Sequence, residues 1–165
     1  MDFSTEHRFA APPADVAALM VDPDFEASVE LPDLALPEVL EHGRTGTEDV
    51  LRLRYEFTGH LDPIARRVVR NRTLTFVQEV RIDPATGHGR LQLNVEADPD
   101  RVRGEATIRI DAEGDRASVR RIEGTFTVGV PLIGGTAERA ILPGVLRRMD
   151  VEADALAQRI AAGTS

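Results

Sequence analysis

Apolar and polar residues alternate along much of the chain, and this alternation predicts a sheet-rich protein. The first alternating segment, residues 2–9, has the pattern of a strand with one buried side. That side carries Phe3, Thr5, His7 and Phe9. Further alternating segments predict strands near residues 38–44 and at 48–57, 73–82, 89–96, 102–111 and 117–129. Short turns rich in Asp, Pro and Gly separate the last four, which we therefore expect to form consecutive antiparallel hairpins.

The last of these strands changes phase. Val119 lies an odd number of residues before Ile122 and Phe126, and the slip falls at Arg120 and Arg121. A one-residue phase change inside a strand is typical of a β-bulge, which bends the strand. The sequence therefore predicts a bulge at these two arginines, in a sheet that curls.

Three short helices are predicted between the strands. Pro12-Pro13 opens the first, because Pro is tolerated in a first helical turn. Asp22 precedes Pro23 and is the expected N-cap of the second. The segment from His60 to Arg72 contains the third, with Asp62-Pro63 as its N-cap and first residue.

A long helix is predicted at the C-terminal end, from about Leu132 to Ala161. Its apolar stripe includes Ile141, Val145 and Met149. At 1.5 Å per residue, a helix of about 30 residues is long enough to cross the whole sheet. Pro143-Gly144 inside it predicts a helix that is either kinked or divided in two.

This order of elements resembles the START-like superfamily, also called the SRPBCC, helix-grip or birch-pollen-allergen-like fold. The local resemblance is strongest at residues 7–16, HRFAAPPADV, and at residues 130–135, VPLIGG. Together they are similar to a bacterial branch known only as a domain of unknown function. The resemblance implies an α+β fold in which two short N-terminal helices and a long C-terminal helix accompany a curved antiparallel sheet of about six to seven strands.

The resemblance also implies an apolar cavity between the concave face of the sheet and the long helix. Relatives bind lipids, sterols, polyketides, plant hormones or quinones, and some are cyclases or hydrolases. Fold alone does not decide among these functions. No catalytic motif of the superfamily is found at matching positions, so no catalytic residue is assigned.

Inward positions of the predicted strands and of the long helix are the candidate ligand-binding residues. They are His7, Leu53, Tyr55, Phe57, Phe76, Gln78, Leu93, Ile108, Phe126, Ile141, Val145 and Met149. Tyr55 and Gln78 are polar residues on apolar faces, and a buried polar atom needs a partner. That partner is either a ligand in the cavity or a group across the sheet, and the sequence favours neither.

Two further polar candidates have a plainer interpretation. His7 is either a polar anchor or general base in the cavity, or a strand histidine that a neighbouring group satisfies, and we favour the second. Arg148 and Glu152 are spaced i, i+4 near the edge of the helical stripe. This spacing favours a surface ion pair over a charged site.

The length of the chain indicates the number of domains, and its charge disfavours one class of binding partner. A chain of 165 residues fits one domain, residues 1–165, with one core. The net charge is −8, which disfavours a nucleic-acid partner because a phosphate backbone requires a positive stripe. The nearest basic group is formed by Arg66, Arg67, Arg70 and Arg72, which we interpret as a solvated helix face.

Metal, cofactor and nucleophile signals are weak. The chain has no Cys, and its four histidines show no metal-ligand spacing, so no metal site is expected. Gly134-Gly135 lacks the surroundings of a nucleotide-binding loop and is interpreted as a tight turn, so no cofactor is expected. No serine has the context of a nucleophile elbow.

Neither a signal peptide nor a membrane-spanning segment is evident. The N-terminus lacks a basic region followed by an apolar one. The longest uncharged run, residues 124–137, is shorter than the roughly 20 apolar residues of a spanning helix. We therefore expect a cytoplasmic protein without integral membrane association.

Three functions are consistent with these observations. The first is a carrier or sensor of a hydrophobic small molecule that is lipid-, quinone- or polyketide-like. The second is an aromatase/cyclase- or hydrolase-like enzyme that uses polar cavity residues, which requires at least two of His7, Tyr55 and Gln78 to converge on one cavity. The third is a protein-interaction module with a filled core. The sequence does not predict the ligand, the oligomeric state or a reaction.

Overall fold

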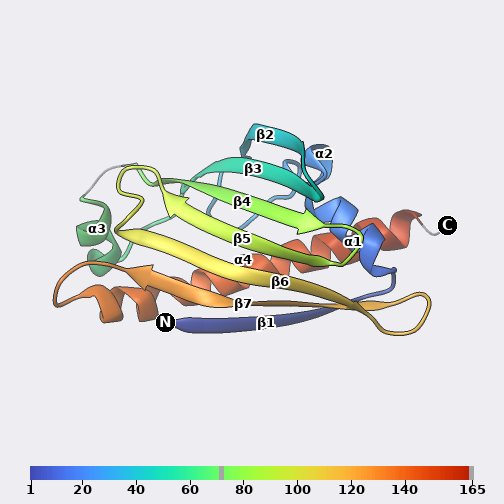
Figure 1. Ribbon diagram of the computed structural model, residues 1–165. Helices are drawn as coiled ribbons and strands as arrows, with labels where there is room; N and C mark the ends of the chain where they lie inside the picture. The colour runs from blue at the N-terminus through green and yellow to red at the C-terminus, as the bar shows by residue number, and fades with distance from the viewer. Residues whose placement is uncertain (71–72, 164–165) are drawn as a thin grey trace.

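Seven strands form one antiparallel sheet in the computed structural model, which describes residues 1–70 and 73–163. The strands are β1 (Asp2–Phe9), β2 (Glu38–Thr45), β3 (Glu48–Glu56), β4 (Thr75–Asp83), β5 (His88–Val95), β6 (Val102–Ala112) and β7 (Ser118–Val128). Their order across the sheet is β1-β7-β6-β5-β4-β3-β2. The predicted meander of consecutive hairpins is confirmed, and β1 completes the sheet by pairing with β7 (Figure 1).

The short helices begin where the sequence predicts. They are α1 (Pro13–Met20), α2 (Pro23–Glu26) and α3 (Pro63–Val69). The Asp22 carboxylate accepts hydrogen bonds from the backbone N–H groups of Asp24 and Phe25. The Asp62 carboxylate accepts one from the N–H of Ala65 at 2.7 Å. Both predicted N-caps are therefore confirmed, and they fix the directions of α2 and α3 at opposite ends of the sheet (Figure 1).

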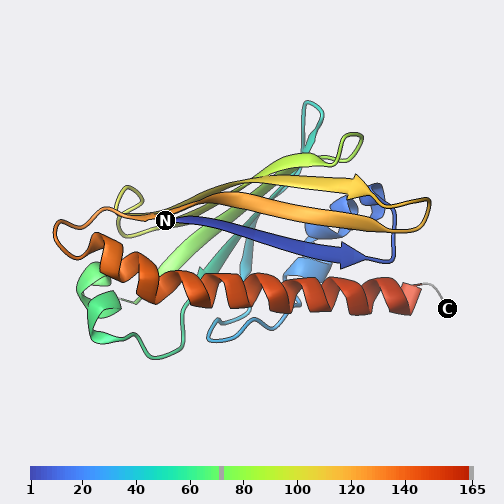
Figure 2. The ribbon, with the colours of Figure 1, turned by 90° about the horizontal axis from the view of Figure 1, so that it is seen from below.

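The long helix α4 (Gly134–Gly163) is continuous, so of the two alternatives predicted for Pro143-Gly144, a kink or a division, the division does not occur. Proline in a helix interior removes one backbone hydrogen bond and crowds the preceding turn, which bends a helix without necessarily ending it. Figure 2 shows the first turns of α4 inclined to the remainder, which is the kink that the sequence allows. Seen from below, α4 runs along β1 and β7, and its contacts concentrate on these strands and on α3.

The predicted bulge in β7 is wrong. The register between β6 and β7 is unbroken from Val102↔Val128 to Ala112↔Ser118, and the register between β1 and β7 is unbroken as well. The inward side of β7 includes Arg120, which is only 1% exposed and in phase with Ile122 and Phe126. The apparent slip in the sequence arose because an arginine stands at a buried position.

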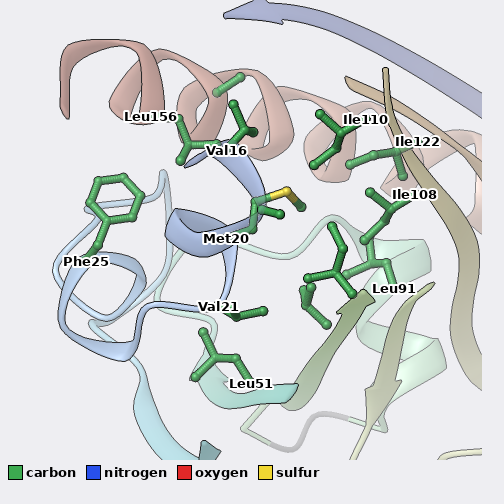
Figure 3. Packing of buried hydrophobic residues seen from close by; sticks show 14 of the residues in the cluster. Val16, Met20, Val21, Phe25, Leu51, Leu91, Ile108, Ile110, Ile122 and Leu156 are labelled. Carbon is green, nitrogen blue, oxygen red and sulfur yellow. The ribbon is translucent and has the colours of Figure 1, made fainter. Parts of the chain in front are cut away.

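One end of the space between the sheet and α4 is filled by an apolar core. Val16 and Met20 of α1 pack there with Ile108 of β6 and Leu156 of α4, as Figure 3 shows. Each of these side chains is at most 4% exposed. Helix α1 therefore covers this part of the sheet and does not cover the middle of the same face.

Candidate functional site

A cavity of about 350 Å³ lies between the sheet and α4. This volume is at the lower end of the roughly 300–1,000 Å³ typical of small-molecule sites. The strand registers place inward residues of β3, β4 and β5 in three rows across the cavity wall. The rows are Leu51, Val80 and Leu91; Leu53, Gln78 and Leu93; and Tyr55, Phe76 and Val95. The wall is mostly apolar, and Tyr55 stacks on Phe76 with ring centroids 5.3 Å apart.

The opposite wall comes from α4 and α3. Helix α4 turns Ile141, Val145 and Met149 toward the space, and α3 contributes Ala65 and Val68. Because α4 packs closely on the β1 and β7 side, the side chains of β3 to β5 face a space that the helix does not fill.

Ten of the twelve predicted ligand-binding positions lie on this cavity wall. They are Leu53, Tyr55, Phe57, Phe76, Gln78, Leu93, Phe126, Ile141, Val145 and Met149. The structure thus brings Tyr55 and Gln78 together on one cavity, and ligand contact by any of the ten stays a prediction. The other two predicted positions, His7 and Ile108, do not line the cavity. Ile108 faces the correct side of the sheet, but it is covered by α1 in the apolar core.

A buried ion pair closes one side of the cavity. Both Nη atoms of Arg120 donate to the Glu152 carboxylate, at 3.1 and 2.8 Å, in a bidentate arrangement. The Arg120 guanidinium also lies over the ring of Phe9, 5.4 Å from its centroid. Both charged side chains line the cavity. This pair joins β7 to α4 at a point where the sequence predicts neither a buried arginine nor a link between these elements.

Glu26 completes the buried polar group. It is 5% exposed and, like Glu152, lines the cavity. Burial raises the pKa of Glu26 well above its usual value near 4.5, and the neighbouring Glu152 charge raises it further. The raised pKa favours the protonated form of Glu26, whereas the charge of Glu152 is balanced by Arg120.

The Tyr55 hydroxyl belongs to the same group. Burial raises the pKa of Tyr55, and the nearby Glu26 and Glu152 raise it further, so the phenol stays neutral. Among the residues that the structure describes, the hydroxyl makes no hydrogen bond. We call Glu26, Tyr55, Arg120 and Glu152 the inner polar cluster.

His7 lies behind this cluster, between β1 and α4. Its Nδ1 is 3.3 Å from Nη2 of Arg120, and its Nε2 is 2.8 Å from the Asp150 carboxylate. An arginine only donates, so Nδ1 accepts and Nε2 carries the hydrogen that Asp150 accepts. His7 is therefore satisfied by neighbouring side chains, as the favoured interpretation predicts, and its assignment as a cavity residue is wrong.

The mouth of the cavity is marked by its exposed lining residues. They are Asp33, His60, Asp62, Ala140 and Arg147. Across this mouth, Arg148 donates from Nε to the Pro32 carbonyl at 2.8 Å and lies over the Phe57 ring. Nη2 of Arg147 is 3.4 Å from the Asp33 carboxylate. These contacts tie α4 to the segment between α2 and β2.

Arg148 and Glu152 do not form the predicted surface pair. Glu152 turns inward to Arg120, whereas Arg148 turns to the mouth, and both line the cavity. Burial of Arg148 lowers its pKa. The i, i+4 spacing does place the two residues close together on α4, but each forms its hydrogen bonds with a residue outside this helix.

The basic group predicted near α3 lies at the surface. Arg66, Arg67 and Arg70 are exposed, as expected for a solvated helix face, while Arg72 lies outside the described residues. Within residues 1–70 and 73–163, no three His, Asp or Glu side chains come together as a metal site. None of the helices in this part of the chain has the length and apolar character needed to cross a membrane.

Comparison with known proteins supports the fold. Residues 4–160 match the family DUF2505, described as a protein of unknown function. No curated protein matches the sequence. Among solved structures, the protein TTHA0849 from Thermus thermophilus is 18% identical, with all of both chains covered and a TM-score of 0.70.

Two further solved structures have the same fold. The Zhui aromatase/cyclase from Streptomyces sp. R1128 is 15% identical over 100% of this chain and 96% of its own, with a TM-score of 0.66. A START superfamily protein from Mycobacterium smegmatis is 16% identical over 98% and 97%, with a TM-score of 0.58. The predicted START-like, helix-grip fold is therefore confirmed.

Proposed function

The chain belongs to the DUF2505 family, and from this premise we propose that it binds a hydrophobic small molecule in the cavity between the sheet and α4, as a carrier or sensor. The observation that supports the proposal best is the cavity itself. Three rows of mainly apolar side chains face a space of about 350 Å³ that α4 spans without filling. This open space supports ligand binding over the alternative of an interaction module with a filled core.

The proposal extends to the character of the ligand. Apolar wall residues favour a lipid-, quinone- or polyketide-like molecule, because burying apolar area drives association. The exposed mouth between α3, α4 and residues 31–34 gives such a molecule a route from solvent. The ten predicted residues on the wall are proposed to be its contacts.

Filling the cavity is expected to abolish this binding. Val145→Trp places an indole in the space between α4 and β4, so we expect at least about a hundredfold loss of affinity for the neutral apolar probe N-phenyl-1-naphthylamine. Mass spectrometry of organic extracts from natively purified protein should likewise detect a ligand with the wild type and none with the variant. The matched control is Gln158→Trp, which adds the same side chain at an exposed position of α4.

Two outcomes would count against the proposal. One is equal probe binding by Val145→Trp and Gln158→Trp. The other is a wild-type protein that carries no extractable compound and does not bind the probe. Circular dichroism of each variant confirms that folding is retained.

An enzyme of the aromatase/cyclase or hydrolase kind is the second candidate. The observation that favours it is that Tyr55 and Gln78 line the same cavity as Glu26 and Glu152. General acid–base catalysis requires such groups within hydrogen-bond reach of the substrate.

Comparing bound compounds distinguishes a carrier from an enzyme. If the protein is a carrier, a Tyr55→Phe/Gln78→Leu double variant should contain the same compound as the wild type, in a smaller amount. If it is an enzyme, the double variant should accumulate a different compound, the unconverted substrate. High-resolution mass spectrometry of the two extracts provides the comparison, and Gln92→Leu, an exposed substitution on β5, is the control.

A further inference from the structure

Three arginines line the cavity, and they differ in how their charges are balanced. Arg120 gives both of its Nη atoms to Glu152, at 3.1 and 2.8 Å. Within the described residues, Arg147 and Arg148 have one carboxylate between them, that of Asp33. Its Oδ2 is 3.4 Å from Nη2 of Arg147 and 4.0 Å from Nη2 of Arg148. At the mouth, two guanidinium groups therefore face a single carboxylate.

Arg148 is held in place by contacts that leave most of its hydrogens unused. Its Nε donates to the Pro32 carbonyl at 2.8 Å, and its guanidinium lies over the Phe57 ring, 5.6 Å from the centroid. Neither Nη atom donates a hydrogen bond to any of residues 1–70 and 73–163. Both Nη atoms keep accessible surface, and the side chain is 17% exposed. A guanidinium carries several N–H donors in one plane, so a ligand at the mouth can reach those of Arg148.

Gly144 leaves room for this guanidinium. It lies one turn before Arg148 on α4 and also lines the cavity. A Cβ atom at this position would lie 3.2 Å from Nη1 of Arg148, which is closer than an ordinary contact. Glycine is unfavourable inside a helix compared with alanine, and here its missing side chain allows the cation to lie against the helix at the cavity wall.

The second carboxylate at the mouth, that of Asp62, is engaged elsewhere. It caps α3 by accepting a hydrogen bond from the N–H of Ala65 at 2.7 Å. In the described part of the chain it forms no ion pair with Arg147 or Arg148. The two arginines are therefore not neutralised from the α3 side of the mouth.

We propose that the cavity mouth binds the anionic head group of an otherwise apolar ligand, a carboxylate or a phosphate ester, with Arg148 donating from its Nη atoms and Arg147 adding a second positive charge. The planar fork of arginine matches the oxygens of both head groups, and such charge-assisted hydrogen bonds are among the stronger ones. The head group stays at the exposed mouth and keeps part of its hydration, while the apolar chain occupies the cavity. The inference rests on the proposed function, since it specifies the ligand class of the same cavity.

Four compounds with a decyl chain test the inference by displacement of N-phenyl-1-naphthylamine at neutral pH. Decanoate and decyl phosphate carry the two anionic head groups, 1-decanol is neutral, and decylamine is cationic. We expect the wild type to bind at least one of the anions about tenfold more tightly than 1-decanol, and decylamine least. The anion that binds more tightly identifies the head group.

Loss of the cation should remove this preference. In Arg148→Met, the affinity ratio of the preferred anion to 1-decanol should fall to about one, while 1-decanol binding stays within about threefold of the wild type. Arg148→Lys should keep part of the preference, because it retains the charge but not the fork. The matched control is Arg159→Met, which removes the same charge from an exposed position of α4 and should leave the ratio unchanged.

A gain of affinity is expected when the competing carboxylate is removed. Asp33 has a φ of 60°, in the left-handed region that asparagine also adopts readily, so Asp33→Asn keeps the backbone. This variant should bind the preferred anion at least about threefold more tightly and 1-decanol unchanged. Glu30→Gln, the same change of charge at a nearby exposed position, is the control. A purely structural role of Arg148 predicts no such gain.

The outcomes separate this inference from the proposed function. If N-phenyl-1-naphthylamine does not bind, both are overturned. If the probe binds but 1-decanol or decylamine competes as well as either anion, or no decyl compound displaces the probe, the cavity binds apolar molecules and the head-group site is wrong. An anion preference that survives in Arg148→Met, or that falls equally in Arg159→Met, also overturns the inference. So does an Asp33→Asn variant that gains no more than Glu30→Gln.

Discussion

Replacing Arg120 by Met is expected to lower the free energy of unfolding by about 3–5 kcal/mol, because it leaves the partly buried Glu152 without its counter-charge. Arg120 is 1% exposed and holds the Glu152 carboxylate through two hydrogen bonds. Removing one partner of a buried pair costs more than the pair contributes, since the remaining charge is desolvated and unpaired. Equilibrium urea unfolding, followed by circular dichroism, provides the measurement.

The neighbouring residue offers a matched control. Arg121 is on the same strand, but its side chain is 40% exposed and pairs with Glu6 on the outer face. Arg121→Met should change the free energy of unfolding by no more than about 0.5–1 kcal/mol, as for other surface ion pairs. Equal effects of the two substitutions would contradict the buried-pair description.

A double variant keeps the test decisive if Arg120→Met alone does not fold. Arg120→Met/Glu152→Met removes both charges, and replacement of a buried ion pair by apolar residues is often neutral or stabilising. We expect the double variant to recover most of the stability that the single variant loses. A double variant as unstable as Arg120→Met would mean that the arginine acts through something other than Glu152.

Substitution of Glu26 by Gln is expected to change how stability depends on pH. The folded-state pKa of Glu26 lies well above 4.5, so the folded protein retains a proton that the unfolded chain has lost as pH rises past this value. The wild-type free energy of unfolding therefore carries a term that falls with increasing pH, by up to about 1.4 kcal/mol per pH unit, until the pH passes the folded-state pKa. Gln does not titrate, so the term is absent from Glu26→Gln.

The difference in free energy of unfolding between the wild type and Glu26→Gln isolates the contribution of the Glu26 carboxyl group. Other carboxylates, including Glu152 and Asp22 near Glu26, are present in both and cancel to first order. The free energy of unfolding of Glu26→Gln, minus that of the wild type, should increase as pH rises above 4.5. This difference should become constant once the pH exceeds the folded-state pKa of Glu26. Urea unfolding over a pH series measures the difference, and Glu30→Gln is the exposed control. A difference independent of pH would show that Glu26 is ionised in the folded protein.

Local pattern was enough to predict the sheet, the caps and ten residues of the cavity wall. Alternation assigns each strand residue to a face, and Leu53, Gln78 and Leu93 form one row because their strands are consecutive hairpins with continuous registers. The N-caps at Asp22 and Asp62 depend on residues within three positions, so they too are visible in the sequence.

The alternation of apolar and polar residues could not predict contacts between residues that are far apart in the sequence. His7 and Ile108 are on the correct face, but which helix covers each part of that face depends on the position of α1 and α4. The phase slip was interpreted as a bulge at Arg120 and Arg121. Arginine rarely occupies a buried position without a partner, and the partner of Arg120, Glu152, comes 32 residues later on another element. The phase slip was the one available signal, because a strand without a bulge places Arg120 on the inner face of the sheet. Nothing near Glu26 in the sequence marks it as buried.

Tyr55 has one more consequence, which concerns spectroscopy. The chain has a single tyrosine and no tryptophan, and that tyrosine is 2% exposed on the cavity wall, stacked on Phe76. Tyrosine absorption, emission and near-ultraviolet circular dichroism of this protein therefore all come from one ring beside the inner polar cluster. The tyrosine signal therefore reports on the proposed contact between a ligand and the cavity wall, and no label needs to be introduced to observe it.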